Sequence, residues 1–140
     1  MTGFQATQID HVSVIITDVA RSRHFYRDIL GLKEIAKPKT FRFVALWFDL
    51  GHQQLHLLLK DKPDQKSARH FALSVRDVSA ARSYFRDHGI PVEETTVIPG
   101  ADRFFVYDPD SNRIELIKWL EPYNPADSGA AELDGANGAG

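Results

Sequence analysis

The sequence predicts an α+β fold that is built from two βαβββ modules. The main observation is an internal repeat, because the chain matches a shifted copy of itself at one offset along a unit of about fifty residues. In both copies, short apolar runs suited to strands alternate with a segment of helical spacing. The matching segments are 9–12 with 68–71, 18–19 with 77–78, 25–28 with 84–87, 48–49 with 107–108, and 55–58 with 114–117.

The first copy contains the elements of one module in order. Asp18 occupies the position expected of a helix N-cap, and Gly31 stands where that helix is expected to end. A turn at residues 50–52 separates the last two strands. The pattern predicts a strand over 9–16, a helix over 19–30, and strands over 32–37, 41–49 and 53–60.

The second copy repeats this order, with Asp77 before its helix and Gly89 after it. The first copy holds an extra residue near Leu30-Gly31, where the register slips and then recovers. A polar turn at 108–112 separates the last two strands of the second copy. The pattern predicts a strand over 69–75, a helix over 78–88, and strands over 91–98, 102–108 and 112–119.

These limits predict one domain followed by a tail. We expect the domain to span residues 1–122, with module one over about 8–60 and module two over about 67–120. From Tyr123 onward the residues are small and polar and show no periodicity. This composition predicts a disordered tail over 123–140.

Composition excludes several classes of function. The absence of cysteine excludes disulfides, thiol catalysis and cysteine-based zinc sites. A net charge of −2 and scattered basic residues argue against a nucleic-acid partner. No apolar run approaches the ~20 residues that a membrane helix needs, and the first residues lack the pattern of a signal peptide. We therefore expect a cytoplasmic protein whose partner is a small molecule.

The repeat singles out four polar residues at matching positions. His11 and His70 lie in the first strand of each copy, and His56 and Glu115 lie in the last. A carboxylate among apolar neighbours is unfavourable unless it is paired or binds a metal, and three imidazoles with one carboxylate suit Zn, Fe, Mn, Co or Ni. Taken singly, each histidine also fits a hydrogen-bonded position and Glu115 a cross-strand salt bridge. The symmetry of the set favours a metal site.

Aromatic residues stand on the strands beside this set. Trp47 and Phe48 lie on one strand, and Phe104, Phe105 and Tyr107 lie on its counterpart in the second copy. Alternation along a strand divides them between the core and a cavity. The sequence leaves open which residues take which side.

Over residues 8–120 the chain resembles the vicinal oxygen chelate superfamily, which includes glyoxalases, bleomycin-resistance proteins and extradiol dioxygenases. The motifs are IDHVSVIITDVARSRHFYRDILGL, QLHLLL, RHFALSVRDV and DPDSNRIELIKW. The resemblance implies paired modules whose curved mixed sheet encloses a cavity with one divalent metal ion. It maps the metal ligands onto His11, His56, His70 and Glu115, and it implies a homodimer. The modules of such proteins pair within one chain or across two.

Departures from the family pattern leave the reaction open. His56 replaces the Glu of bacterial glyoxalase I, and Ile15 and Lys60 replace its glutathione-binding Arg and Asn. Phe105 replaces a Tyr that is common in extradiol dioxygenases. The leading hypothesis is a metal-dependent lyase or isomerase acting on a small oxygenated substrate, with Glu115 or a metal-bound water as catalytic base. The alternatives are an Fe(II) or Mn dioxygenase and a non-catalytic protein that sequesters a ligand.

Overall fold

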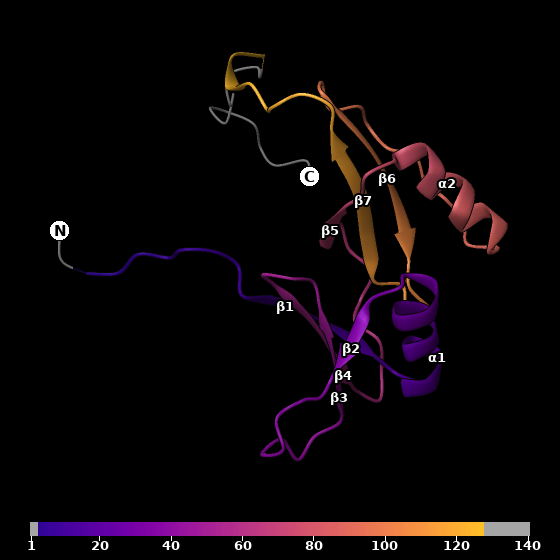
Figure 1. The fold of residues 1–140 in the computed structure, drawn as a ribbon. Coiled ribbons are helices and arrows are strands. Elements are labelled where there is room, and N and C mark those ends of the chain that lie inside the picture. The colour runs from indigo at the N-terminus through magenta and orange to yellow at the C-terminus, as the bar shows by residue number, and fades with distance from the viewer. Residues whose placement is uncertain (1–2, 128–140) are drawn as a thin grey trace.

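The computed structural model describes residues 3–127, which form two β-sheets with helices packed beside them (Figure 1). Helices α1 and α2 lie on the same side of the molecule in this view, and each sheet lies beside its own helix. In chain order the elements are β1 (His11–Ile16), α1 (Val19–Arg23), the π-helix η1 (His24–Ile29), β2 (Lys33–Ile35), β3 (Ala45–Asp49), β4 (Gln54–Leu59), β5 (His70–Ser74), α2 (Val78–Asp87), β6 (Ala101–Tyr107), β7 (Arg113–Trp119) and the 3-10 turn η2 (Pro125–Asp127).

The two sheets share one strand order. The first sheet is ordered β1-β4-β3-β2, and the second is ordered β5-β7-β6. In each sheet the first strand of the module runs parallel to its last strand, and the remaining pairs are antiparallel. The predicted α+β class and the mixed sheets are confirmed. β1 and β5 lie at the ends of their sheets, so each has an edge that pairs with no strand of the described chain.

The ends of both helices follow the predicted signals. The side chain of each N-cap aspartate accepts a hydrogen bond from the backbone N–H three residues later. Arg21 N donates to Asp18 and Ala80 N donates to Asp77, each at 2.9 Å. Gly31 has φ of 70° and Gly89 has φ of 71°, a conformation that other residues rarely adopt. These contacts satisfy groups that a helix end would otherwise leave without partners.

The extra residue of the first copy is accommodated inside its helix. Residues 24–29 form a π-helix, in which Leu30 N donates to Phe25 O at 2.8 Å. A π-turn holds one more residue than an α-turn, so it absorbs an insertion without moving the ends of the element. The register slip in the repeat therefore has a local structural cause.

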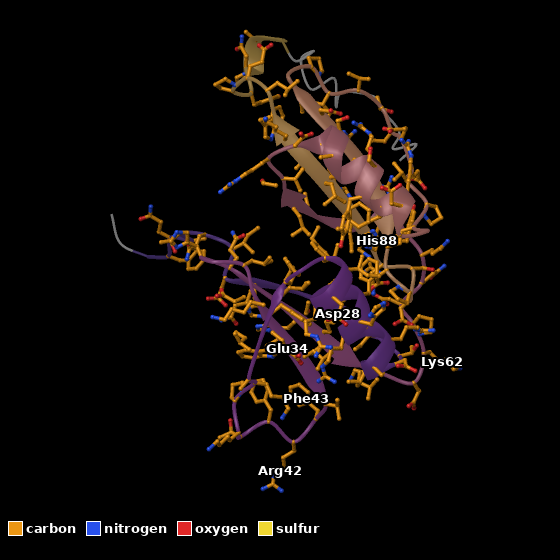
Figure 2. All side chains as sticks on the ribbon, turned by 45° about the vertical axis from the view of Figure 1, so that its right-hand side comes forward. Asp28, Glu34, Arg42, Phe43, Lys62 and His88 are labelled. Carbon is orange, nitrogen blue, oxygen red and sulfur yellow. The ribbon has the colours of Figure 1, made fainter. Side chains whose placement is uncertain are left out.

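Several predicted strands are shorter than expected, among them the one over 32–37, which forms only β2 (Lys33–Ile35), and one predicted strand is absent. The segment 91–98 forms no strand, and only Glu93 pairs with the sheet, through two hydrogen bonds to Phe105. Pro91 lacks a backbone N–H and limits pairing at the start of this segment. The strand expected over 41–49 begins at Ala45. Figure 2 shows Arg42 at the far end of the loop that precedes it, with Phe43 nearer to the sheet.

A single core joins the two modules. The alternate residues Val12, Val14 and Ile16 of β1 pack toward this core, and so do Phe71 and Leu73 of β5. Full burial of each large apolar side chain stabilises the fold by about 1.5–3 kcal/mol. Among the described residues, the fully buried hydrophobic side chains come from both modules: Ile16, Tyr26, Phe48, Leu55, Leu57, Phe104, Phe105, Val106 and Ile114.

The loop between β6 and β7 ties the second module to the first. Asp110 is almost fully buried, and its carboxylate accepts hydrogen bonds from the backbone N and the hydroxyl of Thr17 and from Arg21. Asn112 Nδ2 donates to Ile15 O at 2.7 Å. We call residues 108–112 the inter-module loop.

A buried tyrosine makes a further contact with this loop. Tyr26 OH donates to Asp108 Oδ2 at 2.6 Å. Burial raises the pKa of Asp108, and it also raises that of Tyr26 well above its usual value, with the Asp108 charge adding to the effect. Asp108 also accepts from the backbone N of Asp110 and of Asn112, which holds the loop in its turn.

Within residues 3–127, no helix is long and apolar enough to cross a membrane. The predicted tail is described only in part. Residues 125–127 form the 3-10 turn, and Tyr123 packs edge-on against Trp119 with ring centroids 5.8 Å apart. The rest of the predicted tail, 128–140, lies outside the described residues.

Candidate metal centre

The four predicted ligands all lie on the sheet faces that point away from the core. His11 alternates with Val12 along β1, and His56 lies between the fully buried Leu55 and Leu57 on β4. The same alternation holds in the second sheet for His70 on β5 and Glu115 on β7. Because residues on a strand alternate between two faces, this placement leaves all four side chains available to a site outside the core.

The first sheet brings His11 and His56 together. Their rings stack with centroids 4.2 Å apart, and the other face of His56 stacks on Trp47 at 3.8 Å. His56 Nε2 lies 2.9 Å from Gln54 Oε1. Burial lowers the pKa of His56 and the neighbouring His11 lowers it further, against a smaller opposing effect of Asp10. This shift favours the neutral imidazole, which is the form that binds metals.

The second sheet brings His70 and Glu115 together. His70 Nε2 lies 2.9 Å from Glu115 Oε2, and His70 Nδ1 lies 2.9 Å from the backbone oxygen of Ala68. The other oxygen of Glu115 accepts a hydrogen bond from Arg103 at 3.3 Å. Phe105 stands opposite Glu115 in the ladder, and its ring meets His70 edge-on.

The four residues do not meet within one chain. Among residues 3–127, no three His, Asp or Glu side chains lie close enough together to hold a metal ion. The predicted set is present as two pairs, one on each sheet: His11 and His56 are in ring contact, and His70 and Glu115 are within hydrogen-bond distance. Every pair therefore supplies half of the predicted ligand set.

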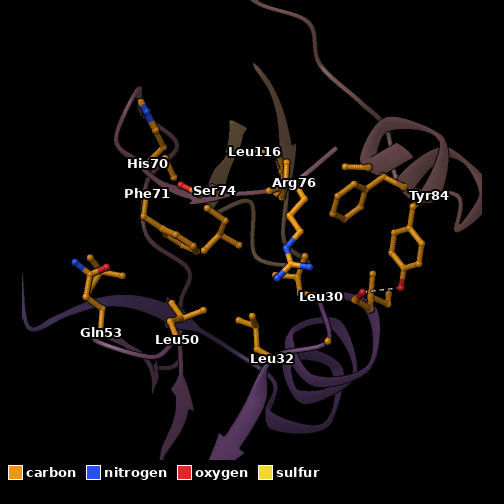
Figure 3. A pocket seen from close by; sticks show the side chains of 18 of the residues that line it. Leu30, Leu32, Leu50, Gln53, His70, Phe71, Ser74, Arg76, Tyr84 and Leu116 are labelled. Carbon is orange, nitrogen blue, oxygen red and sulfur yellow. Dashed lines mark hydrogen bonds between the residues drawn. The ribbon is translucent and has the colours of Figure 1, made fainter. Parts of the chain in front are cut away.

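Two cavities lie along the free edges of β1 and β5. The larger has a volume of about 1160 Å³ and is lined by Phe71 and Ser74 of β5, by Leu30 and Leu32 after the first helix, and by Tyr84 of α2 (Figure 3). The smaller, of about 360 Å³, lies between residues 12–14 of β1 and residues 69–71. Of the four predicted ligands, only His70 lines these cavities, and it lines both of them.

The structure resolves which aromatic residues face the candidate site. Trp47 lies on the site face of the first sheet, and Phe105 and Tyr107 lie on that of the second, whereas Phe48 and Phe104 lie on the core faces. Phe105 is nevertheless only 1% exposed. Arg103 was not singled out by sequence reasoning, because the repeat gives it no matching polar partner. The sequence did hold one indication: in the predicted hairpin, strand alternation places this basic residue on the same sheet face as Glu115.

With this geometry established, comparison with known proteins defines the class. Residues 8–116 match the model of the Glyoxalase/Bleomycin resistance protein/Dioxygenase superfamily, and the chain belongs to this family. It is 29% identical to Glyoxylase I 4 of Arabidopsis thaliana over 79% of this chain and 70% of that protein. It is 28% identical to the metallothiol transferase FosB of Staphylococcus saprophyticus over 77% of this chain and 74% of that protein.

The fold comparison agrees with this assignment. A solved structure of a glyoxalase family protein from Bacillus anthracis superposes with a TM-score of 0.78 and 28% identity, covering 84% of this chain and 99% of the other. The fold predicted from the resemblance is confirmed. The family contains proteins of several activities, so the reaction of this chain is a separate question.

Proposed function

We propose that this protein is a metal-dependent enzyme whose site forms between two copies of the chain. His11 and His56 of one copy and His70 and Glu115 of the other would hold one divalent ion, chosen from Fe, Mn, Ni, Zn and Co. The observation that carries this proposal is the division of the four residues into two close pairs on separate sheets.

The free edges of the sheets support this assembly. β1 and β5 each end a sheet, and an unpaired edge is a template for another strand. If β1 of one copy lies beside β5 of the second, the His11–His56 pair faces the His70–Glu115 pair. Two-fold symmetry then forms two such sites in a homodimer, because each copy offers both edges. The cavities along these edges provide the surface against which the second copy would pack.

The donor set fits a catalytic ion. Three imidazoles and one carboxylate leave positions that water or substrate can occupy. A divalent ion bound there supplies a Lewis acid that polarises adjacent oxygens of a substrate. Rigid strands fix the ligands, and Trp47 and Gln54 hold the ring of His56 from two directions.

Within this site Glu115 is the residue that we assign to proton transfer. It is almost fully buried, yet one of its oxygens faces His70 and the other faces Arg103. If one oxygen is released during turnover, the carboxylate can accept a proton from a carbon next to the chelating oxygens. This role corresponds to a lyase or isomerase acting on a small oxygenated substrate.

A dioxygenase is the second candidate, and Phe105 disfavours it. The ring lies directly across the ladder from Glu115, where the resemblance places a Tyr in many extradiol enzymes. Phenylalanine has no hydroxyl with which to donate a hydrogen bond to a bound substrate. His56 would also take a position that a three-ligand site leaves open.

Metal content and oxygen uptake test the proposed function together. The full chain is purified without chelators or a metal-affinity column, its metal is measured by mass spectrometry, and catechols are offered in an oxygen electrode. We expect close to one ion per chain and no oxygen uptake. Metal-dependent oxygen uptake would instead assign a dioxygenase. A chain that holds no metal and takes none up would be a ligand-sequestering protein.

A further inference from the structure

Arg103 is a guanidinium held beside the candidate metal ligand Glu115. Only 15% of its side chain is exposed, and its Nη1 donates to Glu115 Oε1 at 3.3 Å. Nη2 donates to Thr96 O at 2.8 Å, while Nε is buried and has no hydrogen-bond partner. A guanidinium carries five N–H donors, so most of the donors of Arg103 remain free.

A second guanidinium lies on the same face. Arg113 stacks on Phe105 with its central carbon 3.6 Å from the ring centroid, and it pairs with Glu93 at 3.3 Å. Its Nε is also buried without a partner. Among the described residues, three buried side-chain polar atoms lack a partner, and two of them are the Nε atoms of these arginines. Unsatisfied buried donors are rare enough that their pairing on one face calls for a function.

The charges on this face indicate what such donors would bind. Arg103 and Arg113 balance Glu93 and Glu115 when no metal is present. A divalent ion on Glu115 would leave this face with an excess of two positive charges. A neutral substrate would not compensate them, whereas an anionic oxygen group would, through charge-assisted hydrogen bonds to a guanidinium.

We propose that Arg103 binds an anionic oxygen group of the substrate, so that the enzyme selects metal-chelating carboxylates or phosphonates over neutral chelators. This inference rests on the proposed metal site. Arg103 is the better placed of the two arginines because its donors lie next to the ligand carboxylate. Its central carbon is 5.7 Å from the centroid of the Phe105 ring, whereas that of Arg113 stacks on the same ring at 3.6 Å. The residue would contact the substrate itself and thereby determine specificity.

Arg82 supplies a matched control on the opposite face of the same sheet. It pairs with two carboxylates, Glu94 and Asp102, and lies over the ring of Phe104, which belongs to the core. Arg82 Nη2 also donates to the backbone oxygen of Arg103 at 3.2 Å. Substitution of Arg82 therefore removes two ion pairs and this backbone contact from the module, but it removes no side chain from the site face. Any general effect of losing an arginine should appear in both variants.

The test measures ligand binding to the cobalt-loaded protein. Co²⁺ is bound to the wild type, Arg103→Met, Arg103→Lys and Arg82→Met, and its visible spectrum is titrated with oxalate, methylphosphonate and imidazole. Arg103→Met should lower the affinity for oxalate or methylphosphonate by about ten- to a hundredfold, and the affinity for imidazole by less than about threefold. Arg103→Lys should recover part of the loss, and Arg82→Met should match the wild type. The anion whose affinity falls more in Arg103→Met identifies the substrate group, a carboxylate for oxalate and a phosphonate for methylphosphonate.

Three results would overturn the inference. If the Arg103→Met variant binds Co²⁺ and both anions as the wild type does, Arg103 does not bind the anionic group, and the metal site still stands. Arg103→Met that loses Co²⁺, imidazole and anions equally would make Arg103 a positioning residue for Glu115. A wild type that takes up no Co²⁺ would overturn the metal site, and the inference with it.

Discussion

Replacing Glu115 with Gln is expected to weaken metal binding severely while leaving the fold intact. The amide keeps the size of the side chain but removes the charge that a divalent ion requires from the single carboxylate of the set. We expect the dissociation constant for Co²⁺ or Zn²⁺ to rise by about a hundredfold or more. Isothermal titration calorimetry measures this change directly, and circular dichroism confirms that the variant is folded.

Glu93→Gln is the matched control for this substitution. Glu93 pairs with Arg113 and Tyr107 on the same face, and it is about half exposed, so it lies near the site without belonging to the ligand set. Its substitution should change metal affinity by less than about threefold. Equal losses in the two variants would mean that the face acts through its overall charge, and that Glu115 is not a ligand.

Replacing Asp110 with Ala is expected to have the largest effect on stability. Its carboxylate accepts hydrogen bonds from Thr17 and Arg21, across the boundary between the modules, and only 3% of its side chain is exposed. Removal leaves the backbone N–H of Thr17 without its partner. We expect the free energy of unfolding to fall by about 2–3 kcal/mol, most of it from the contacts to Thr17, because Arg21 is half exposed.

Urea denaturation compares this variant with Asp64→Ala. Asp64 is an exposed residue that pairs with Arg69 at the surface, so its substitution should change stability by less than about 0.5 kcal/mol. If Asp110→Ala unfolds at the wild-type urea concentration, the inter-module loop does not hold the modules together. A separate first transition in urea would instead show that the modules come apart before they unfold.

Much of the fold follows from local sequence signals. Asp18, Asp77, Gly31 and Gly89 mark the helix ends, and each behaves in the structure as its local chemistry predicts. The strand expected over 91–98 was wrong, because apolar content alone does not reveal how few ladder hydrogen bonds a segment flanked by prolines can make. Local patterns thus predict where elements lie better than how far each strand pairs.

The arrangement of the candidate site needed the structure. The repeat places His11 with His70 and His56 with Glu115, because these residues occupy equivalent strands. In three dimensions the close pairs are His11 with His56 and His70 with Glu115, because the first and last strands of each module are neighbours. Equivalence in a repeat carries no information on which sheet edges meet, and that choice decides whether one chain or two form the site.

Mixed dimers test the central claim most directly. His11→Ala and Glu115→Gln chains, carrying different peptide tags, are co-expressed, and the dimer that contains one of each is isolated and its metal measured. If the site forms between copies, each variant alone binds no metal, while the mixed dimer retains one intact site and about half the wild-type metal content. Mixed dimers without metal, beside a metal-replete wild type, would contradict the account and place all four ligands within one chain.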